Sequence, residues 1–243
     1  MKFSYSAVWD DTLRLVREHG ALLAAIAGVF IFLPSLLLGY LLPAPESVST
    51  DANEAFQMAM DYYRGNLHWF LLVGVIAMWG SLAVLRLIFP RQATVAGAIT
   101  AAAALLPFYF LVSLISGFIV GIGFLLLILP GLYLWGRLLP AAPAMVAEER
   151  RNPLDALKRG WELSEGHGWL IIGLYLLVAI PAGIMMLVIA QLTGIVFILA
   201  TGQQFGTLLG MIVLCAMQAL VSALLTMLAA AVYRALAPRK PEL

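Results

Sequence analysis

The fold of this chain is decided by one apolar stretch of 55 residues, ATVAGAITAAAALLPFYFLVSLISGFIVGIGFLLLILPGLYLWGRLLPAAPAMVA (93–147), whose only charged residue is Arg137. A helix that crosses the hydrocarbon core of a bilayer needs about 20 apolar residues. The stretch is therefore too long for one membrane-spanning helix and about right for two. We expect the turn between them near SLISGFIVG (113–121), where serine and glycine residues cluster.

The composition of the whole chain is typical of a membrane protein. Of its 243 residues, 63% are hydrophobic and 11% are charged, and the mean hydropathy is +0.99. About a quarter of the residues in a soluble domain are charged. We therefore expect an all-α, polytopic transmembrane helical bundle that forms a single transmembrane domain (1–243) and leaves no room for a soluble catalytic domain. The predicted layout has about six spans, at residues 20–42, 67–89, 94–116, 118–139, 168–192 and 204–233.

The basic residues indicate how these spans are oriented, because Lys and Arg accumulate on the cytoplasmic side of a membrane. If the N-terminus lies inside, 13 of the 14 Lys and Arg residues fall on the cytoplasmic side, and Arg64 is the one that falls outside. An even number of spans then places both the N- and the C-terminus in the cytoplasm.

A charged segment, EERRNPLDALKRGWELSEGHGW (148–169), separates two of the long apolar regions. Asn before Pro, at 152 and 153, favours a helix start. Apolar residues then recur on one helix face, at Leu154, Leu157 and Trp161. This pattern predicts an amphipathic helix at 153–165 that lies in the cytoplasmic interface of the membrane. The segment is either an anchor that sets the orientation or a docking surface for a headgroup or a partner protein.

The first residues of the chain resemble that segment. Apolar residues at Trp9, Leu13 and Val16 share one face, which predicts a second interfacial helix at 5–18. The stretches LVREHGALL (15–23) and LSEGHGWLI (163–171) place a His-Gly pair at the same point. The two units are either a parallel internal repeat or a chance likeness.

Arg137 is the most informative single residue of the spans. A charged side chain at membrane depth is costly and marks a functional or a pairing position. We expect Pro130 and Gly131 to break or kink its helix. One interpretation has Arg137 reach the inner surface or pair with an acidic residue, namely Glu148, Glu149 or Glu162. The other has it contact a phosphate, together with Lys158, Arg159 and Trp161 of the charged segment.

The last predicted span carries a polar stripe at i, i+4 spacing, formed by Gln218, Ser222 and Thr226. Such side chains join neighbouring helices by hydrogen bonds in most membrane proteins. The alternative is that the stripe lines a polar pathway. Two glycine pairs, Gly117 with Gly121 and, in this last span, Gly206 with Gly210, have the spacing that allows two helices to approach closely.

The motifs of catalysis are absent. The three histidines, His19, His68 and His167, are scattered and lack the spacing of metal ligands. The sequence contains neither a nucleophile elbow nor a phosphate-binding loop. We therefore predict no catalytic residue, no metal site and no cofactor. The single cysteine, Cys215, excludes an internal disulfide.

The stretch PGLYLWGRLLPAAPAMVAEERRNPLDALKRGWELSEGHGWLIIG (130–173) resembles the membrane domain attached to some glycerophosphoryl diester phosphodiesterases. The positions that match its pattern are Pro130, Gly131, Arg137, Glu148, Ala156, Leu157, Arg159, Trp161 and Leu163. Gly160 stands where that family usually has Ser. The resemblance implies a six-span membrane domain of the bacterial inner (cytoplasmic) membrane, without the phosphodiesterase barrel.

The expected function is that of a non-enzymatic integral membrane protein, a lipid- or partner-interacting module in envelope and membrane homeostasis. The alternative is a transporter of a lipid-like or amphipathic solute. The expected partners are membrane lipids, with anionic headgroups of the inner leaflet foremost, and a protein partner or a second copy of the chain. No binding to nucleic acid is expected.

Overall fold

The computed structural model describes residues 3–42, 51–89 and 94–237, and their regular structure is entirely helical. In chain order the elements are α1 (Tyr5–Ala27), a π-helical turn η1 (Gly28–Phe32), α2 (Leu33–Leu41), α3 (Ala52–Gly65), α4 (Leu67–Ile88), α5 (Val95–Leu126), α6 (Ile128–Leu138), α7 (Ala141–Ala147), α8 (Pro153–Leu163), α9 (Gly168–Thr201) and α10 (Gln203–Leu236).

Five helices of the described residues are long and apolar enough to cross a bilayer. They are Tyr5–Leu41, Leu67–Ile88, Ala96–Leu126, Gly168–Thr201 and Phe205–Leu236. The expectation of an all-helical membrane protein with several spanning helices is therefore confirmed, with five helices that qualify in place of about six.

The difference lies in the apolar stretch 93–147. The predicted turn at 113–121 is wrong, because these residues continue α5 without a break. The chain turns instead at Leu127, whose backbone is extended (φ −163°, ψ 154°). The predicted span 118–139 is thus divided between the end of α5 and the 11 residues of α6. At 1.5 Å per residue α6 is about 16 Å long, roughly half of a 30 Å hydrocarbon core.

The N-terminal helix is longer than expected. α1, η1 and α2 form one helix of 37 residues, so the interfacial helix predicted at 5–18 is the first part of a longer helix. At η1 the amide of Leu33 donates to the carbonyl of Gly28, one residue beyond the α-helical pattern. Pro34 follows at once and has no amide hydrogen to donate, which is a common setting for a π-turn.

The two halves of the suggested repeat also differ in structure. His19 and Gly20 lie inside the continuous helix α1, whereas His167 precedes Gly168 at a helix start. The likeness of the two His-Gly stretches therefore does not extend to their backbones.

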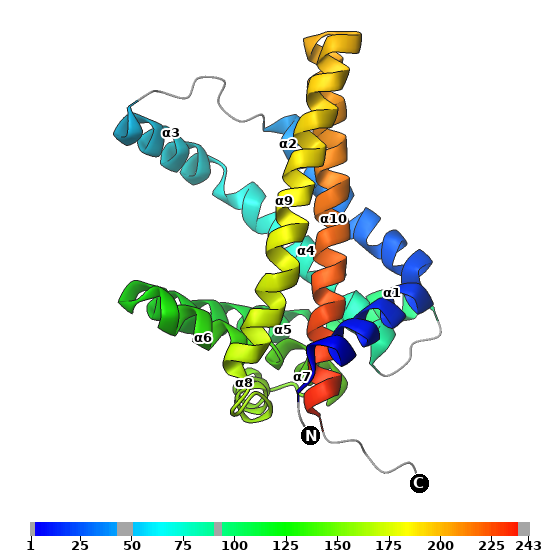
Figure 1. Cartoon of the computed structure of the whole chain (residues 1–243), viewed down its shortest axis with the longest axis vertical. Coiled ribbons are helices and arrows are strands. Elements are labelled where there is room, and N and C mark those ends of the chain that lie inside the picture. The colour runs from blue at the N-terminus through cyan, green and yellow to red at the C-terminus, as the bar shows by residue number, and fades with distance from the viewer. Residues whose placement is uncertain (1–2, 43–50, 90–93, 238–243) are drawn as a thin grey trace.

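α9 and α10 form a tall antiparallel hairpin that is the longest feature of the molecule (Figure 1). Glycines allow its helices to approach. A Cβ on Gly206 would lie 2.3 Å from the backbone nitrogen of Ile198, and a Cβ on Gly210 would lie 3.1 Å from the Cα of Gly194. The close approach expected for Gly206 and Gly210 is therefore present in the structure. The same expectation is wrong for Gly117 and Gly121, where an added Cβ would meet no heavy atom within 4 Å.

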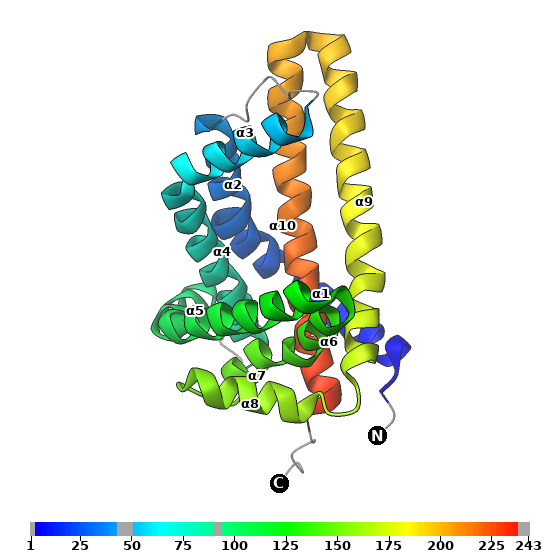
Figure 2. The ribbon, with the colours of Figure 1, turned by 90° about the vertical axis from the view of Figure 1, so that its left-hand side faces the viewer.

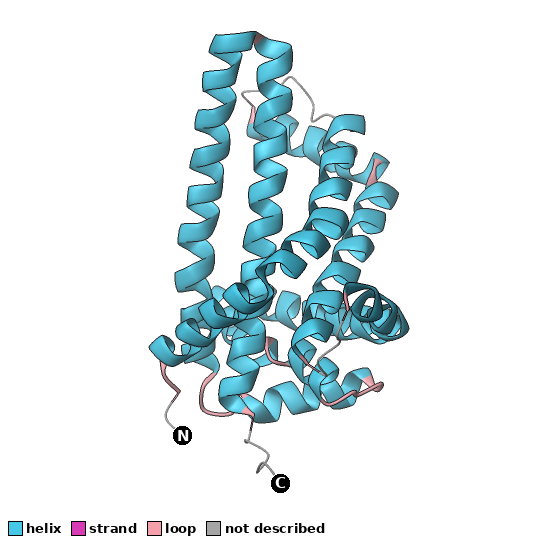
Figure 3. Ribbon diagram, turned by 90° about the vertical axis from the view of Figure 1, so that its right-hand side faces the viewer, coloured by secondary structure: helices cyan, strands magenta, loops and turns pink. Residues whose placement is uncertain are grey.

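α5 runs across the direction of this hairpin, near the end at which the described chain begins and ends (Figures 1 and 2). The best-buried side chains lie in this crowded end and come from α1, α4, α7, α9 and α10; they include Leu15, Leu82, Leu85, Met145, Ile171, Met227 and Leu228. The opposite end of α9 and α10 projects beyond the other helices (Figure 3).

α8 begins as predicted, because the side chain of Asn152 accepts a hydrogen bond of 3.1 Å from the amide of Leu154. On this helix Ala156, Leu157 and Gly160 are buried against the protein, whereas Leu154 and Trp161 are exposed. α8 packs on α7 through Gly160, where a Cβ would lie 2.7 Å from the Cα of Ala141. The placement of α8 in the membrane interface stays a prediction.

Candidate functional site

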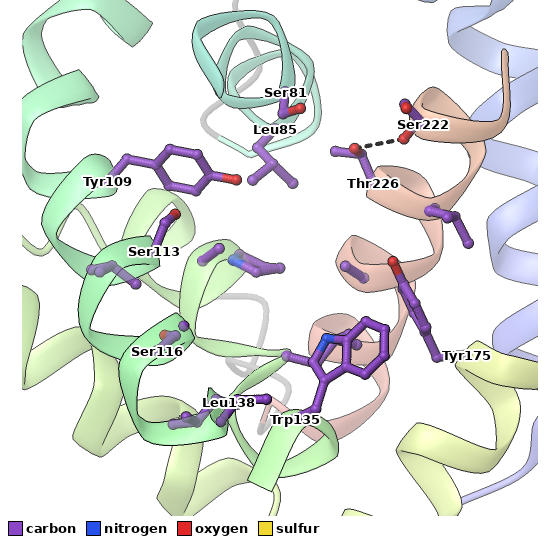
Figure 4. A pocket seen from close by; sticks show the side chains of 18 of the residues that line it. Ser81, Leu85, Tyr109, Ser113, Ser116, Trp135, Leu138, Tyr175, Ser222 and Thr226 are labelled. Atoms are coloured by element: carbon purple, nitrogen blue, oxygen red, sulfur yellow. Dashed lines mark hydrogen bonds between the residues drawn. The ribbon is translucent and has the colours of Figure 1, made fainter. Parts of the chain in front are cut away.

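At the crowded end of the molecule an open cavity of about 640 Å³ lies between α4, α5, α6, α7, α9 and α10 (Figure 4). We call it the hydroxyl cavity. Its polar lining residues are Ser81, Tyr109, Ser113, Ser116, Trp135, Tyr175, Ser222 and Thr226. These residues are far apart in the sequence and come from five helices.

Helical spacing aligns the α5 members of this lining. Tyr109, Ser113 and Ser116 stand at i, i+4 and i+7, so they share one face of α5. Figure 4 shows Tyr109 directed toward α10, where Ser222 and Thr226 stand one turn apart. The cavity is thus faced by hydroxyl groups from two helices that cross one another.

The opposite wall is aromatic. The rings of Trp135 on α6 and Tyr175 on α9 lie 5.4 Å apart between centroids, edge to face. Figure 4 shows both rings beside the space that the hydroxyl groups surround. An aromatic wall offers a large apolar surface together with a polar N–H or O–H group.

Two of the hydroxyl groups bond to their own helix. Ser81 donates to the carbonyl of Ala77 at 3.1 Å, and Thr226 donates to that of Ser222 at 2.8 Å. Within the described residues, no protein group hydrogen-bonds to the remaining hydroxyls, which belong to Tyr109, Ser113, Ser116, Tyr175 and Ser222. These groups are available to a molecule in the cavity.

The rest of the lining is apolar. Leucine, valine, alanine and phenylalanine side chains supply most of it, and the described residues around the cavity include no Asp, Glu, Lys, Arg or His. The volume lies in the range of small-molecule sites, which combine apolar walls with a few placed polar groups. Because a buried charge without a partner is costly, the cavity suits an amphipathic molecule that carries no net charge.

The polar stripe of the last span is divided by this arrangement. Ser222 and Thr226 line the hydroxyl cavity, whereas Gln218, one turn away, is exposed and lies outside its lining. The three residues of the stripe therefore do not line one common surface.

Arg137 lies outside the hydroxyl cavity. Arg137 is 5% exposed, and one terminal nitrogen of its guanidinium group donates a hydrogen bond to the carbonyl of Trp161 at 2.8 Å. The guanidinium carbon lies 4.1 Å from the centroid of the Trp161 ring, and the other terminal nitrogen lies 3.4 Å from the hydroxyl of Tyr133. Arg137 thus fastens α6 to α8, helped by Ser164, whose hydroxyl donates to the Arg137 carbonyl at 2.8 Å.

The acidic residues proposed as partners of Arg137 pair with other arginines. Glu148 accepts hydrogen bonds from Arg150 at 2.7 Å and from Arg159 at 2.9 Å, and the hydroxyl of Tyr233 lies 3.2 Å away. Arg159 also lies 3.7 Å from Glu162. These contacts tie α8 and the α7–α8 turn to the end of α10.

A second ion pair fastens the same turn to α4. Glu149 has a left-handed backbone (φ 51°), which is uncommon for a residue other than glycine. Its carboxylate accepts a hydrogen bond of 3.0 Å from the buried Arg86. The predicted phosphate contacts thus differ in availability, since Arg137 and Arg159 are engaged within the protein, whereas Lys158 and Trp161 are exposed on α8.

Pro130 and Gly131 lie three and four residues after the helix break, in the first turn of α6. The break itself is at Leu127, and α6 ends at Leu138, just before Pro140. The predicted break at Pro130 and Gly131 therefore does not fall at these residues, which lie inside α6, and the break at Leu127 makes α6 a short helix.

Electrostatics hold Glu148 in its charged form. Partial burial raises the pKa of its carboxyl. The hydrogen bonds and charges of Arg159 and Arg150 lower this pKa by more, so it lies below that of an ordinary glutamate. The pKa of Arg159 is raised, chiefly by its hydrogen bond to Glu148. The cluster is therefore an ion pair at neutral pH.

This cluster predicts a loss of stability in acid. Because the folded-state pKa of Glu148 is depressed, its contribution is fully present above the pKa of an unfolded glutamate and is lost as the pH falls through the lower, folded-state value. We expect Glu148→Gln to lower the free energy of unfolding by about 2 kcal/mol at neutral pH. The loss should be much smaller at a pH below the folded-state pKa of Glu148. Unfolding in mixed detergent micelles across pH measures this. An equal cost at both ends would show that the charge of Glu148 does not stabilise the fold.

Sequence reasoning missed most of the hydroxyl cavity. Ser113 and Ser116 were interpreted as part of a turn, whereas they are polar positions on the inner face of a continuous helix. Tyr109 and Tyr175 were not singled out. A usable signal was present, because Tyr109, Ser113 and Ser116 have helical spacing in an otherwise apolar helix.

Among the described residues, no three His, Cys, Asp or Glu side chains gather where they could hold a metal ion. Comparisons with protein-family models, with curated proteins and with solved structures find no match to this chain. The class that the fold defines is an all-helical, multi-pass membrane protein, with five helices among the described residues that are long and apolar enough to span. Assignment to the phosphodiesterase-associated family stays a prediction.

Proposed function

We propose that this chain is a non-enzymatic membrane protein that binds an uncharged lipid or lipid-like molecule in the hydroxyl cavity. The observation that carries the proposal is the lining, which joins apolar walls to five hydroxyl groups without a partner among the described residues and includes no charged side chain. A glyceride or long-chain alcohol has the matching chemistry, since its chains fit apolar walls and its uncharged polar end accepts and donates hydrogen bonds.

The geometry supports the cavity over the arginines as the lipid site. Arg137 already donates to the carbonyl of Trp161 and Arg159 to the carboxylate of Glu148, so a phosphate would have to displace these partners. The Nε atom of Arg137 is buried and has no partner among the described residues. Lys158 and Trp161 are exposed on α8 and are free to meet headgroups. We therefore assign headgroup contact to these two residues and selective binding to the cavity.

The wider setting is part of the same proposal. We place the chain in the bacterial inner membrane, with both termini in the cytoplasm and α8 at the inner interface. The resemblance of 130–173 to the membrane domain of glycerophosphoryl diester phosphodiesterases suggests a role in envelope lipid homeostasis. Transport is less well supported, because the exposed Gln218 leaves the polar stripe without continuation beyond the cavity.

The test places one bulky residue on either side of α5. Ser113→Trp fills part of the hydroxyl cavity and removes a hydroxyl, whereas Leu114→Trp adds a similar ring on the exposed face. Native mass spectra are recorded in mild detergent with added dioleoylglycerol. We expect the protein and Leu114→Trp to retain it, and Ser113→Trp to bind it about tenfold more weakly, equivalent to about 1.4 kcal/mol.

Equal binding by all three proteins, or binding by none, would contradict the proposal. Loss of an anionic phospholipid from Lys158→Ala, with dioleoylglycerol absent throughout, would move the lipid site to α8.

A further inference from the structure

The turn between α5 and α6 exposes a contiguous apolar surface. Five consecutive residues, Leu125–Leu129, are all aliphatic and between 65% and 86% exposed. A contiguous apolar patch of this kind marks contact with another protein or with a membrane. We propose that α5 and α6 form a hairpin that lies in one leaflet without crossing the bilayer, with this tip inserted among the acyl chains of that leaflet.

The two arms of the hairpin, α5 and α6, pack directly against each other. A Cβ on Gly123 would lie 2.9 Å from the Cα of Gly131, and a Cβ on Gly131 would lie 2.5 Å from the ring of Phe124. The two arms therefore touch through glycine backbone. The tip is held in its exposed position by this packing.

The length of α6 confines the tip to one side of the membrane. At its far end, Arg137 is bonded to Trp161 of α8, within the charged segment of the chain. The tip therefore lies about 16 Å of helix from that segment, whereas the hydrocarbon core is about 30 Å thick. A span that ended at Leu127 would need a longer return helix than α6 provides.

The direction of the hairpin leads to the same conclusion. α9 and α10 have 34 residues each, about 51 Å, so each is long enough to cross a hydrocarbon core of about 30 Å. α5 and α6 run across them in both views (Figures 1 and 2). If α9 and α10 cross the membrane, the hairpin lies along it, although α5 is long and apolar enough to span.

The backbone of the tip indicates its depth. Leu127 donates to the carbonyl of Gly123 at 3.0 Å, the amide of Gly131 donates to Leu127 at 3.3 Å, and Pro130 has no amide hydrogen. The amides of Ile128 and Leu129, in the first turn of α6, lack helical partners. Unpaired amides are too costly for the middle of a bilayer but are hydrated at the headgroup boundary. The backbone of the tip therefore lies at this boundary, and its side chains reach the acyl chains.

Acyl chains are a better occupant than a second copy of the chain. All five exposed side chains of the tip are aliphatic and flexible, and they carry no hydrogen-bonding group that would give a protein interface its orientation. Contact with acyl chains requires no hydrogen-bonding group.

The experiment uses single cysteines in a Cys215→Ala background, since Cys215 is the only native cysteine. Leu127→Cys reports on the tip, Lys158→Cys on the face that carries α8, and Gln203→Cys on the α9–α10 turn. A membrane-impermeant maleimide is added to right-side-out and to inverted membrane vesicles. The controls are expected to react from opposite faces.

We expect Leu127→Cys to react at least tenfold more slowly than Lys158→Cys from the α8 face, and not at all from the Gln203 face. A bimane on Leu127→Cys in nanodiscs should lose most of its fluorescence to lipids with a nitroxide at acyl carbon 5. Reaction from the Gln203 face would show that α5 crosses the membrane and would overturn the proposal. Reaction at the Lys158→Cys rate, or an efficient disulfide between two Leu127→Cys copies, would place water or protein at the tip and would equally overturn it.

Discussion

Replacing Gly136 by alanine is expected to reduce the free energy of unfolding by about 3 kcal/mol. A Cβ at this position would lie 2.4 Å from the carbonyl oxygen of Gly168 and 2.9 Å from the Cβ of Ile172. The first of these atoms belongs to the backbone at the start of α9 and cannot rotate away. The added methyl would therefore separate α6 from α9 and widen the wall that carries Trp135.

Gly121→Ala is the matched control for this substitution. Gly121 lies inside α5 and has no heavy atom within 4 Å of an added Cβ. Alanine gains about 1 kcal/mol of helix propensity over glycine at either position. We expect Gly121→Ala to be neutral or stabilising and Gly136→Ala to unfold at markedly lower SDS in mixed micelles. Similar behaviour of the two variants would show that α6 and α9 are not held at the distance seen in the structure.

Replacing Arg137 by methionine is expected to cost about 3 kcal/mol of folding free energy without loss of bound lipid. The substitution keeps the aliphatic stem but removes the charged hydrogen bond to the Trp161 carbonyl and the cation–π contact at 4.1 Å. The carbonyl then keeps only the hydroxyl of Ser164, at 3.1 Å, as a side-chain donor. A hydrogen bond to a charged group contributes about 1.5–3 kcal/mol, and a partly desolvated cation–π contact about 1–2 kcal/mol. Arg137→Lys should recover only part of this loss, because an ammonium group cannot bond and stack at the same time.

Lys158→Met provides the comparison, because Lys158 is exposed on the neighbouring helix α8. Unfolding curves and native mass spectra of the two variants separate the interpretations of Arg137. A destabilised Arg137→Met that keeps its phospholipid agrees with a residue that joins α6 to α8. A stable variant that has lost a phospholipid would make Arg137 a headgroup ligand.

The glycine at position 160 illustrates how the fold accounts for a detail of the sequence. A Cβ at this position would lie 2.7–2.8 Å from three atoms of Ala141, so any larger residue would push α8 from α7. The physical reason for glycine at this position became visible only with the contact of the two helices.

Composition and local spacing were sufficient for the class of the protein and for several local features. Long apolar runs require a lipid environment wherever they are placed, so the all-helical membrane class followed from hydropathy alone. The start of α8 at Asn152 followed from capping, which depends on neighbours in the chain. The spacing of small residues agreed with the closeness of α9 and α10 at Gly206 and Gly210, but the same spacing at Gly117 and Gly121 makes no such contact.

Other properties depend on contacts between distant segments and were decided by the tertiary structure. Hydropathy cannot distinguish two spans from one long helix and a short return, so the turn at Leu127 and the orientation of α5 were not predictable from it. Ser113 and Ser116 looked like turn residues until Ser222 and Tyr175 were found across a cavity from them. The partner of Arg137 was likewise a matter of packing, because several acidic groups and one main-chain carbonyl were within reach along the chain. The sequence by itself determined that this chain needs a lipid environment and where its helices are apolar. The way the helices cross determined which polar groups come into contact, because each of these contacts joins residues that are far apart in the sequence.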